Sequence, residues 1–243
     1  MTSTQPSVAF LQLLAHEVRW QIIDLLKQSD LRVQEIVQAV GHPQNFVSYH
    51  LKQLRDFHLV TERRSDVDRR DIYYSLDTET LAQWYHQTGV ALHPLCIAPK
   101  TAIQPPIAST MSVLFLCTHN SARSQMAEGL LRNFTHERVT VTSAGTDPRP
   151  IDPLTIATMD HLGIAIQRQF PKAVHEVMDR RFTHIITVCD RAREHCPEFP
   201  TVAQYTHWSI PDPLGHSKEV FAATAQQLSL RIRAFLRLEE PAA

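Results

Sequence analysis

The stretch "SVLFLCTHNSARSQMAEG", residues 112–129, joins an apolar run to a short polar loop and then to a helical pattern. Cys117 ends the apolar run, and Arg123 follows it across a loop of mostly small residues. A loop of this kind directs its backbone N–H groups and the N-terminus of the next helix at one point, where an anion can bind. The stretch therefore predicts a buried strand that ends in an oxyanion-binding loop.

The same loop predicts a catalytic cysteine. Its positive field favours the thiolate form of Cys117, which is then a nucleophile at neutral pH. Arg123 is a planar two-pronged donor that suits a tetrahedral oxyanion, and Ser124 can donate a hydrogen bond to the sulfur. The alternative is a buried structural cysteine. The predicted substrate-binding residues lie between the cysteine and the arginine: Thr118, His119, Asn120, Ser121 and Ala122.

Strand-like and helical patterns alternate through the second half of the chain. The predicted strands are 112–117, 139–145, 184–189 and 206–210, and the predicted helices are 121–134, 152–162, 172–180 and one from about 217. This alternation predicts an α/β domain with a doubly wound parallel four-stranded sheet. Ligands bind beyond the carboxyl ends of such strands, so we expect Cys117, Cys189 and Asp212 to gather at one edge.

The first half of the chain follows a different pattern. Apolar residues at helical spacing predict helices over 10–26, 33–40 and 44–57, and Gly41 ends the second. Residues 58–76 have two strand-like ends and a basic tip between them. This order predicts a mainly α winged helix-turn-helix domain whose third helix enters the DNA major groove, although a polar helix face can also be simply solvated. The predicted DNA-binding residues are Gln44, Asn45, Ser48, Tyr49, Lys52, Arg69 and Arg70.

Composition limits the class of protein. The 243 residues include 24 lysines and arginines against 25 aspartates and glutamates, so a nucleic-acid surface must be a local patch. Residues 96–110, rich in proline and without periodicity, predict a linker between a domain of residues 1–95 and one of residues 111–243. No apolar run reaches the ~20 residues of a membrane span, and no signal-peptide pattern is present, which predicts a cytoplasmic location. There the four cysteines are expected to be free or redox-active, and the histidines have no metal-ligand spacing.

The motif "CTHNSARSQMAEG", residues 117–129, resembles the low-molecular-weight tyrosine phosphatase family and is most similar to its arsenate reductase branch. The resemblance implies the doubly wound fold and a general acid that precedes a proline, here Asp212 in "WSIPDPLG". The stretch "TVCDRAREHCPEF" contains Cys189 and Cys196 at the spacing of the thioredoxin-coupled arsenate reductases. A phosphatase needs only Cys117.

This resemblance implies a relay of three thiols, with no bound cofactor and with thioredoxin as the electron donor. Cys117 attacks arsenate, Asp212 protonates the departing oxygen, and Cys189 then attacks the Cys117 sulfur to release arsenite. Cys196 next attacks Cys189, which moves the disulfide to where thioredoxin reaches it. A helix over 189–196 would hold its ends about 10 Å apart, beyond the about 7 Å that a disulfide tolerates, so the segment must unwind on oxidation.

Some reductases of this branch also bind potassium beside the loop through an asparagine, a glutamate, a serine and a Thr-x-Asp. Asn120, Glu128 and Ser143 are present, but Phe170 and Lys172 stand where the last pair would be. We therefore expect no metal site, and Lys172 could take the place of the cation.

Three stretches of the first half, "LAHEVRWQIIDLL", "VSYHLKQLRDFHLV" and "DIYYSL", resemble the ArsR family of arsenic- and metal-responsive repressors. The resemblance implies binding to operator DNA as a homodimer, held by the first helix and by a last helix around Leu81, Trp84, Tyr85 and Leu92. Many members carry a cysteine pair on the second helix, but that stretch here reads "LRVQEIVQAV", and the nearest cysteine is Cys96. DNA binding is therefore better supported than direct arsenic sensing.

Together these features predict an arsenic-responsive transcriptional repressor fused to an arsenate reductase. Two alternatives stay open at this point. One is a transcription regulator whose phosphatase-like domain only senses an oxyanion or a redox state, and the other is a protein tyrosine phosphatase. Arsenite formation with a thioredoxin system distinguishes the three.

Overall fold

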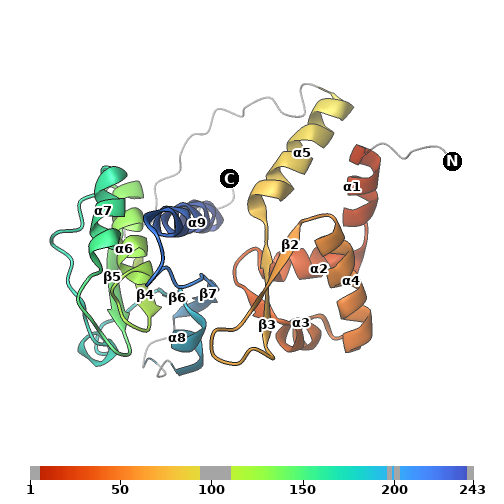
Figure 1. Cartoon of the computed structure of the whole chain (residues 1–243). Coiled ribbons are helices and arrows are strands. Elements are labelled where there is room, and N and C mark those ends of the chain that lie inside the picture. Colours follow the sequence, from red (N-terminus) through yellow and green to blue (C-terminus); the bar gives the residue numbers. More distant parts are fainter. Residues whose placement is uncertain (1–5, 94–110, 196–198, 200–202, 240–243) are drawn as a thin grey trace. The chain divides into compact units, whose positions relative to one another are not determined.

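The computed structural model describes residues 6–93, 111–195, 199 and 203–239. The chain divides into two compact units, Met1–Gln104 and Pro105–Ala243, which are described separately. The predicted linker of residues 96–110 lies outside the described residues, as do Cys96 and Cys196. The exact limits of the two domains therefore stay a prediction. Figure 1 shows the elements of each unit along the chain.

The N-terminal unit has the element order expected of a winged helix-turn-helix (Figure 1). Its helices are α1 (Pro6–Leu14), α2 (Glu17–Leu26), α3 (Val33–Val40), α4 (Gln44–Asp56) and α5 (Thr78–Leu92). Its strands are β1 (Leu31–Arg32), β2 (Val60–Arg64) and β3 (Ile72–Leu76), which pair antiparallel in the order β1-β3-β2. The β2–β3 hairpin is the wing.

The helices of this unit enclose one apolar core. Ile22 of α2, Ile36 of α3 and Leu54 of α4 are fully buried in it. Gly41 ends α3 as predicted, with a left-handed φ of 72° that suits a residue without Cβ. His58 also has a left-handed φ, of 56°, between α4 and β2. This packing buries one side of α4 and leaves its other side to solvent.

One predicted helix of this unit is wrong. The apolar spacing predicts a single helix over 10–26, but the structure breaks it into α1 and α2. The backbone of His16 is extended, and its Nδ1 accepts a hydrogen bond from the N–H of Val18 at 3.3 Å, which caps α2. Both helices face the same core, so apolar residues keep helical spacing across the break and the spacing alone cannot reveal it.

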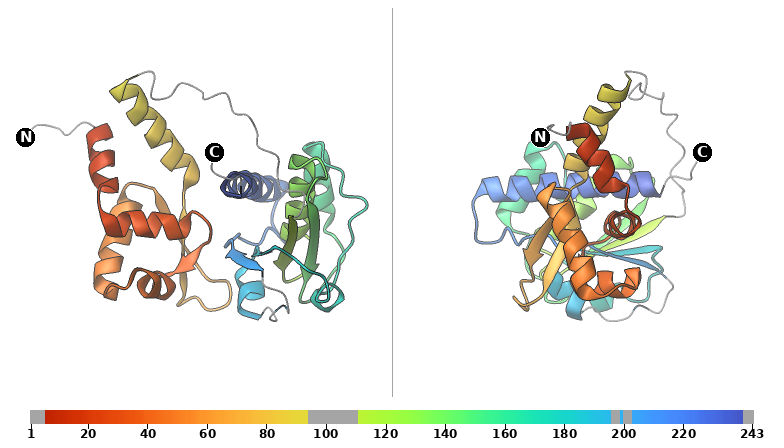
Figure 2. Two further views of the ribbon diagram at one scale, coloured as in Figure 1. Left: turned by 180° about the vertical axis from the view of Figure 1, so that it is seen from behind. Right: turned by 90° about the vertical axis from the view of Figure 1, so that its right-hand side faces the viewer.

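The C-terminal unit is built on a parallel sheet with the strand order β5-β4-β6-β7 (Figure 1). Its strands are β4 (Ser112–Cys117), β5 (Thr140–Gly145), β6 (His184–Thr187) and β7 (Gln204–His207). Its helices are α6 (Arg123–Phe134), α7 (Pro153–His161), α8 (Asp190–His195) and α9 (Lys218–Leu238). The long α9, in blue in Figure 2, packs against α6 and α7. The predicted doubly wound α/β fold is confirmed.

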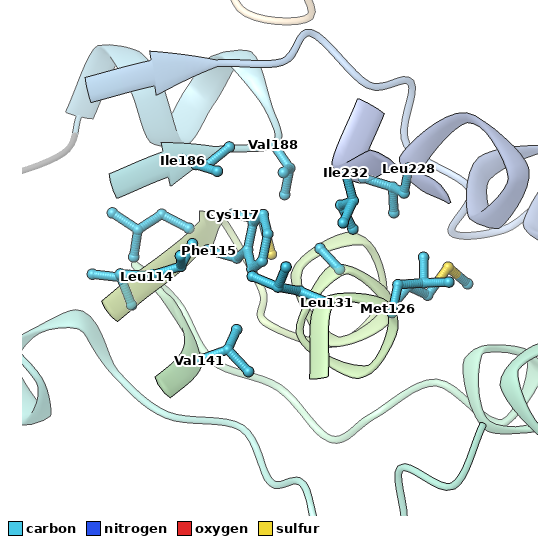
Figure 3. Packing of buried hydrophobic residues seen from close by; sticks show 14 of the residues in the cluster. Leu114, Phe115, Cys117, Met126, Leu131, Val141, Ile186, Val188, Leu228 and Ile232 are labelled. Atoms are coloured by element: carbon cyan, nitrogen blue, oxygen red, sulfur yellow. The ribbon is translucent and has the colours of Figure 1, made fainter. Parts of the chain in front are cut away.

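The central strand β4 is buried along most of its length. Leu114, Phe115 and Leu116 are each no more than 1% exposed. A continuous apolar run of this kind is typical of a parallel strand that is covered on both faces. Figure 3 shows Phe115 beside Leu131 of α6 and close to Ile232 of α9, all members of one core cluster. This packing fixes the position at which the strand ends and Cys117 begins the polar loop.

Two segments of this unit differ from the predicted helices. The helix predicted over 172–180 is only a short 3-10 helix, Val174–Glu176, because Ala173 is extended and bridges to Gly145 at the edge of the sheet. A helix that was not predicted, α8, follows β6 directly. Within the described ranges, none of the helices has both the length and the apolar character of a membrane span.

Candidate active site

Cys117 is the last residue of β4, where a tight loop to α6 begins, and only 2% of its surface is exposed. The backbone N–H of Asn120 donates to its sulfur at 3.1 Å, and Oγ of Ser124 lies 2.8 Å from the same sulfur. The helix α6 begins at Arg123, so the positive end of its dipole adds to the loop. A main-chain donor, a hydroxyl and a helix N-terminus therefore surround the sulfur, which suits a thiolate.

Asn120 holds the loop in this shape. Its φ of 45° lies in the left-handed region, which asparagine tolerates better than most residues. Its Nδ2 donates to Oγ of Ser124 at 2.9 Å and to Oγ of Ser143 at 2.8 Å. Its Oδ1 accepts from the backbone N–H of Lys172 at 2.8 Å. These bonds join the loop to α6, to β5 and to the segment after α7. The loop is therefore held in shape by hydrogen bonds within the protein.

A buried charge network supports Asn120. Oγ of Ser143 donates to Oε2 of Glu128 at 2.6 Å, and Nζ of Lys172 lies 3.7 Å from the same oxygen. Nη2 of Arg132 lies 2.5 Å from the other carboxylate oxygen. Burial lowers the pKa of Lys172, and the Glu128 carboxylate opposes that shift. The amino group of Lys172 thus lies beside Glu128, one of the residues that correspond to potassium ligands in some arsenate reductases. Among the described residues, no group of three histidine, cysteine or acidic side chains could hold a metal ion.

Backbone contacts from the segment after β5 brace the other side of the loop. The N–H of Asp147 donates to the carbonyl of Thr118 at 2.8 Å, and the N–H of Asp152 donates to the carbonyl of Ser121 at 3.1 Å. Oγ1 of Thr155 reaches the same Ser121 carbonyl at 3.1 Å. Sequence reasoning missed this brace because backbone contacts leave little trace in the identity of the residues that make them.

A Gly145→Ala variant is expected to disrupt the loop. A Cβ at Gly145 would lie 2.6 Å from the carbonyl oxygen of Thr118 and 2.9 Å from the backbone nitrogen of Asn120. Neither backbone atom can move without opening the loop. Overpacking of this kind costs about 1–3 kcal/mol, so we expect a lower unfolding temperature and about tenfold weaker binding of inorganic phosphate. Calorimetric titration with phosphate and thermal unfolding measure both effects.

Gly129→Ala is the matched control for this variant. A Cβ at Gly129 would lie 2.7 Å from Cγ2 of the buried Ile166, so this variant also overpacks the unit, but against a side-chain methyl group and not against the backbone of the loop. We expect phosphate binding to be unchanged in this control. Equal phosphate affinities for the Gly145→Ala and Gly129→Ala variants would contradict a role of the close approach in shaping the loop.

Arg123 joins the loop to the residue predicted as the general acid. Its side chain is only 6% exposed, and its Nη2 donates to Oδ2 of Asp212 at 2.8 Å. Its Nη1 donates to the carbonyl of Ile210 at 3.0 Å. The carboxylate of Asp212 is 38% exposed, so it lies where the loop meets solvent. These two bonds use two of the five guanidinium N–H groups.

His119 lies at the rim of the loop. Its side chain is 19% exposed, and Nε2 lies 3.6 Å from Oδ2 of Asp147, which also pairs with Arg149. Burial lowers the pKa of His119, and the Arg149 charge lowers it further, while Asp147 opposes the shift. The imidazole is therefore mostly neutral near pH 7 and adds a polar group rather than a charge to the predicted substrate loop.

Cys189 is brought to the same loop from the segment between β6 and α8. It is 2% exposed, and its sulfur lies 3.4 Å from Oγ1 of Thr118. The backbone N–H of Ala192 donates to the sulfur at 3.3 Å. Burial raises the pKa of the Cys189 thiol, whereas the Arg123 charge lowers it and the neighbouring Cys117 raises it. Two of the three predicted relay thiols therefore lie at one loop.

The helix α8 occupies the segment that follows Cys189. It spans Asp190–His195, and Cys196 lies outside the described residues. The disulfide between Cys189 and Cys196 and the unwinding of their segment on oxidation both stay predictions.

The predicted DNA-binding residues lie on exposed surface of the N-terminal unit. The solvent side of α4 carries Gln44, Asn45, Ser48, Tyr49 and Lys52, all exposed. Arg69 and Arg70 are exposed on the wing, but Arg70 is bound by Asp68: its Nη2 lies 2.7 Å from Oδ2, and its backbone N–H donates to Oδ1 at 2.9 Å. These bonds lower the pKa of Asp68 to about 2, so the carboxylate stays ionised at neutral pH.

Comparison with known proteins relates both units to families. Residues 112–241 match the family described as low molecular weight phosphotyrosine protein phosphatase, and residues 16–62 match the one described as bacterial regulatory protein, arsR family. The chain is 32% identical over 124 residues to arsenate reductase 2 of Staphylococcus saprophyticus, which covers 51% of this chain and 95% of that protein. It is 31% identical over 129 residues to the arsenate reductase of Brevibacillus brevis, covering 53% and 96%. A solved arsenate reductase in a phosphate-binding state is 31% identical, with a TM-score of 0.48, and covers 53% of this chain and 98% of that one.

Proposed function

Because the chain belongs to the low molecular weight phosphotyrosine protein phosphatase family through residues 112–241, with an ArsR-family helix-turn-helix domain ahead of them, we propose that it is a transcription regulator fused to an arsenate reductase. The observation that carries the proposal is the thiol of Cys189, which lies 3.4 Å from Oγ1 of Thr118 in the loop of Cys117. Ester hydrolysis needs one nucleophile, whereas reduction of arsenate needs two electrons, which a pair of thiols supplies.

The proposed reaction begins with attack of the Cys117 thiolate on arsenic. An S–As bond forms, and a hydroxyl group of arsenate leaves as water after it takes a proton from Asp212. A bound oxyanion would take over donors of Arg123, which frees Asp212 to turn toward the departing oxygen. The main-chain donors of the loop hold the remaining negative oxygens.

The second step reduces arsenic. Cys189 gives up its thiol proton and attacks the Cys117 sulfur, the S–As bond breaks, and its electron pair leaves with arsenic, which takes up a proton as arsenite. Arsenic gains two electrons and the two thiols become a disulfide, so the electrons balance. Cys196 then attacks Cys189 and returns Cys117 to its thiol form. A dithiol donor, for which we propose thioredoxin, reduces the Cys189–Cys196 disulfide in the cytoplasm, where thiols are kept reduced.

An assay of the full chain with arsenate, thioredoxin, thioredoxin reductase and NADPH tests this function. We expect one arsenite per NADPH consumed, with no consumption when arsenate is left out. Rapid hydrolysis of an aryl phosphate without arsenate-dependent oxidation of NADPH would favour a protein tyrosine phosphatase. Neither activity, together with operator binding, would favour a regulator whose second domain only senses.

The N-terminal unit is proposed to bind operator DNA and to repress transcription in response to arsenic. Support comes from the ArsR-family match of residues 16–62 and from the polar residues exposed on α4. Binding of a promoter duplex, measured with and without arsenite, tests the response. Equal binding in both conditions would argue against arsenite as the signal.

An Asp68→Asn variant is expected to bind DNA more tightly and with steeper salt dependence. The substitution releases Arg70, whose guanidinium can then meet a phosphate. One added phosphate contact steepens the slope of log K against log salt by about 1. Anisotropy titrations of a labelled duplex at several salt concentrations measure the slope. Asp24→Asn, which removes an exposed carboxylate that pairs with Lys27, is the charge-matched control, and equal slopes for the two variants would refute the role of Arg70.

We also propose a homodimer that forms through α1 and α5. Leu11, Tyr85 and Leu92 expose 43%, 68% and 66% of their surfaces, and Trp20 nearby exposes 61%. Apolar side chains gathered in this way on a surface are typical of a protein–protein interface. Sedimentation should give twice the chain mass of 27.7 kDa, and a monomer at micromolar concentration would contradict the proposal.

A further inference from the structure

Asp190 is a fully buried carboxylate that directly follows Cys189, at the first position of α8. Oγ of Ser209 donates to its Oδ1 at 2.8 Å, and Nε2 of His207 lies 3.3 Å from the same oxygen. Nδ1 of His207 in turn lies 2.8 Å from Oγ1 of Thr187. Burial of a carboxylate is costly unless it is paired and hydrogen-bonded, so these contacts fix where Asp190 can lie.

The partners of Asp190 belong to the segment that carries Asp212. His207 is the last residue of β7, and Ser209 lies between it and Asp212 in the chain. At the other end of this segment, Nη2 of Arg123 donates to the Asp212 carboxylate at 2.8 Å. Asp190 and Arg123 therefore hold the segment at two points, one on each side.

The position of Cys189 also depends on Asp190. The helix α8 has six residues, and a helix this short has no stability of its own in water. Asp190 and Ala192 are its buried side chains, whereas Arg191 and Glu194 are exposed. The N–H of Val188 donates to the carbonyl of Leu116 at 2.8 Å on one side of Cys189, and the buried contacts of Asp190 hold the chain on the other side.

We propose that Asp190 is a positioning residue that fixes Cys189 and Asp212 relative to each other. A single side chain then places both the acid of the first step and the thiol of the second. The role of Cys189 in this proposal rests on the proposed reductase function, whereas the placement of Asp212 matters for any reaction at Cys117. Loosening Asp190 should therefore impair both steps while the anion-binding loop keeps its shape.

An Asp190→Asn variant of the full chain tests the proposal. We expect hydrolysis of an aryl phosphate and single-turnover release of arsenite each to fall about tenfold or more, because small displacements of reacting groups are costly. Inhibition by inorganic phosphate should stay unchanged, since the substitution leaves the loop intact. Alkylation of Cys189 by iodoacetamide, followed by peptide mass spectrometry, should become about tenfold faster as the buried thiol is exposed more often.

A His207→Gln variant separates positioning from charge. Charge by itself predicts faster alkylation of Cys189 in Asp190→Asn, because a negative neighbour disfavours a thiolate, and no increase in His207→Gln, which keeps the Asp190 carboxylate. Positioning predicts faster alkylation in both variants. Faster alkylation in Asp190→Asn without any increase in His207→Gln would overturn the proposal. The thermal unfolding curve of each variant should show a cooperative transition, which establishes that the variants are folded under the conditions of the alkylation assay.

Asp160→Asn, which removes an exposed carboxylate of α7, is the matched control and should behave as wild type. Alkylation and hydrolysis rates of Asp190→Asn equal to those of this control would overturn the proposal. If the wild-type chain releases no arsenite at all, the proposed reductase function fails. The alkylation and hydrolysis measurements still decide the role of Asp190 in that case.

Discussion

A Cys117→Ser variant is expected to form no measurable arsenite, a loss of about 10,000-fold or more. The sulfur receives the N–H of Asn120 at 3.1 Å and lies 2.8 Å from Oγ of Ser124, so its surroundings stabilise a thiolate. A serine hydroxyl in the same place stays protonated at neutral pH and cannot form the disulfide of the proposed relay. Arsenite produced in the thioredoxin assay measures the loss.

The same variant should still bind inorganic phosphate. The main-chain N–H groups of the loop and Arg123 are unchanged by the substitution, so the anion site remains. Ser124→Ala is the graded comparison, because it removes one hydroxyl beside the sulfur and should lower turnover by a much smaller factor. Arsenite formation by the Cys117→Ser variant above a few per cent of wild type would mean that another group is the nucleophile.

An Arg123→Lys variant is expected to lose about 100-fold to 1,000-fold in kcat/KM for arsenate. The guanidinium is buried and donates to Asp212 at 2.8 Å and to the carbonyl of Ile210 at 3.0 Å. Lysine keeps the charge but cannot reproduce the planar pair of donors, so it is expected to lose both the proposed substrate contact and the hydrogen bond to Asp212, the proposed general acid. Initial rates over a range of arsenate concentrations measure the change.

Arg138→Lys is the matched control in the same unit. Arg138 is exposed after the end of α6, and its Nε donates to the carbonyl of Thr135 at 3.1 Å, so we expect less than about a threefold change in kcat/KM. The comparison separates a general effect of replacing an arginine from the loss of the proposed anion contact. Similar losses in the two variants would contradict the assigned role of Arg123.

The loop and the sheet of the C-terminal unit could be predicted because their signals are local. Residues 113–117 form an unbroken apolar run, the polar loop follows directly, and Arg123 begins a helix. A single continuous stretch of sequence therefore predicts the strand, the loop and the helix. The gathering of Cys117, Cys189 and Asp212 followed from the rule that parallel strands share one carboxyl edge.

The supports of the site could not be predicted in the same way. Asp190 and Ser209 are separated along the chain, and neither residue type alone signals a buried pair. The backbone of Ala173 is extended because it bridges to Gly145, a contact that overrides the helical spacing of its segment. The break at His16 was invisible because a capping imidazole replaces the usual serine or aspartate. Each miss is a long-range or backbone contact that side-chain periodicity does not record.

A Cys196→Ser variant isolates the proposed attack of Cys189 on Cys117, because the reaction should stop after this step. The reduced variant is mixed with excess arsenate, without thioredoxin, and then acid-quenched, alkylated and mapped by peptide mass spectrometry. We expect one arsenite per chain and a disulfide that joins Cys117 to Cys189, with neither product in a Cys189→Ser control. Repeated turnover by Cys196→Ser, or arsenite released without that disulfide, would contradict it.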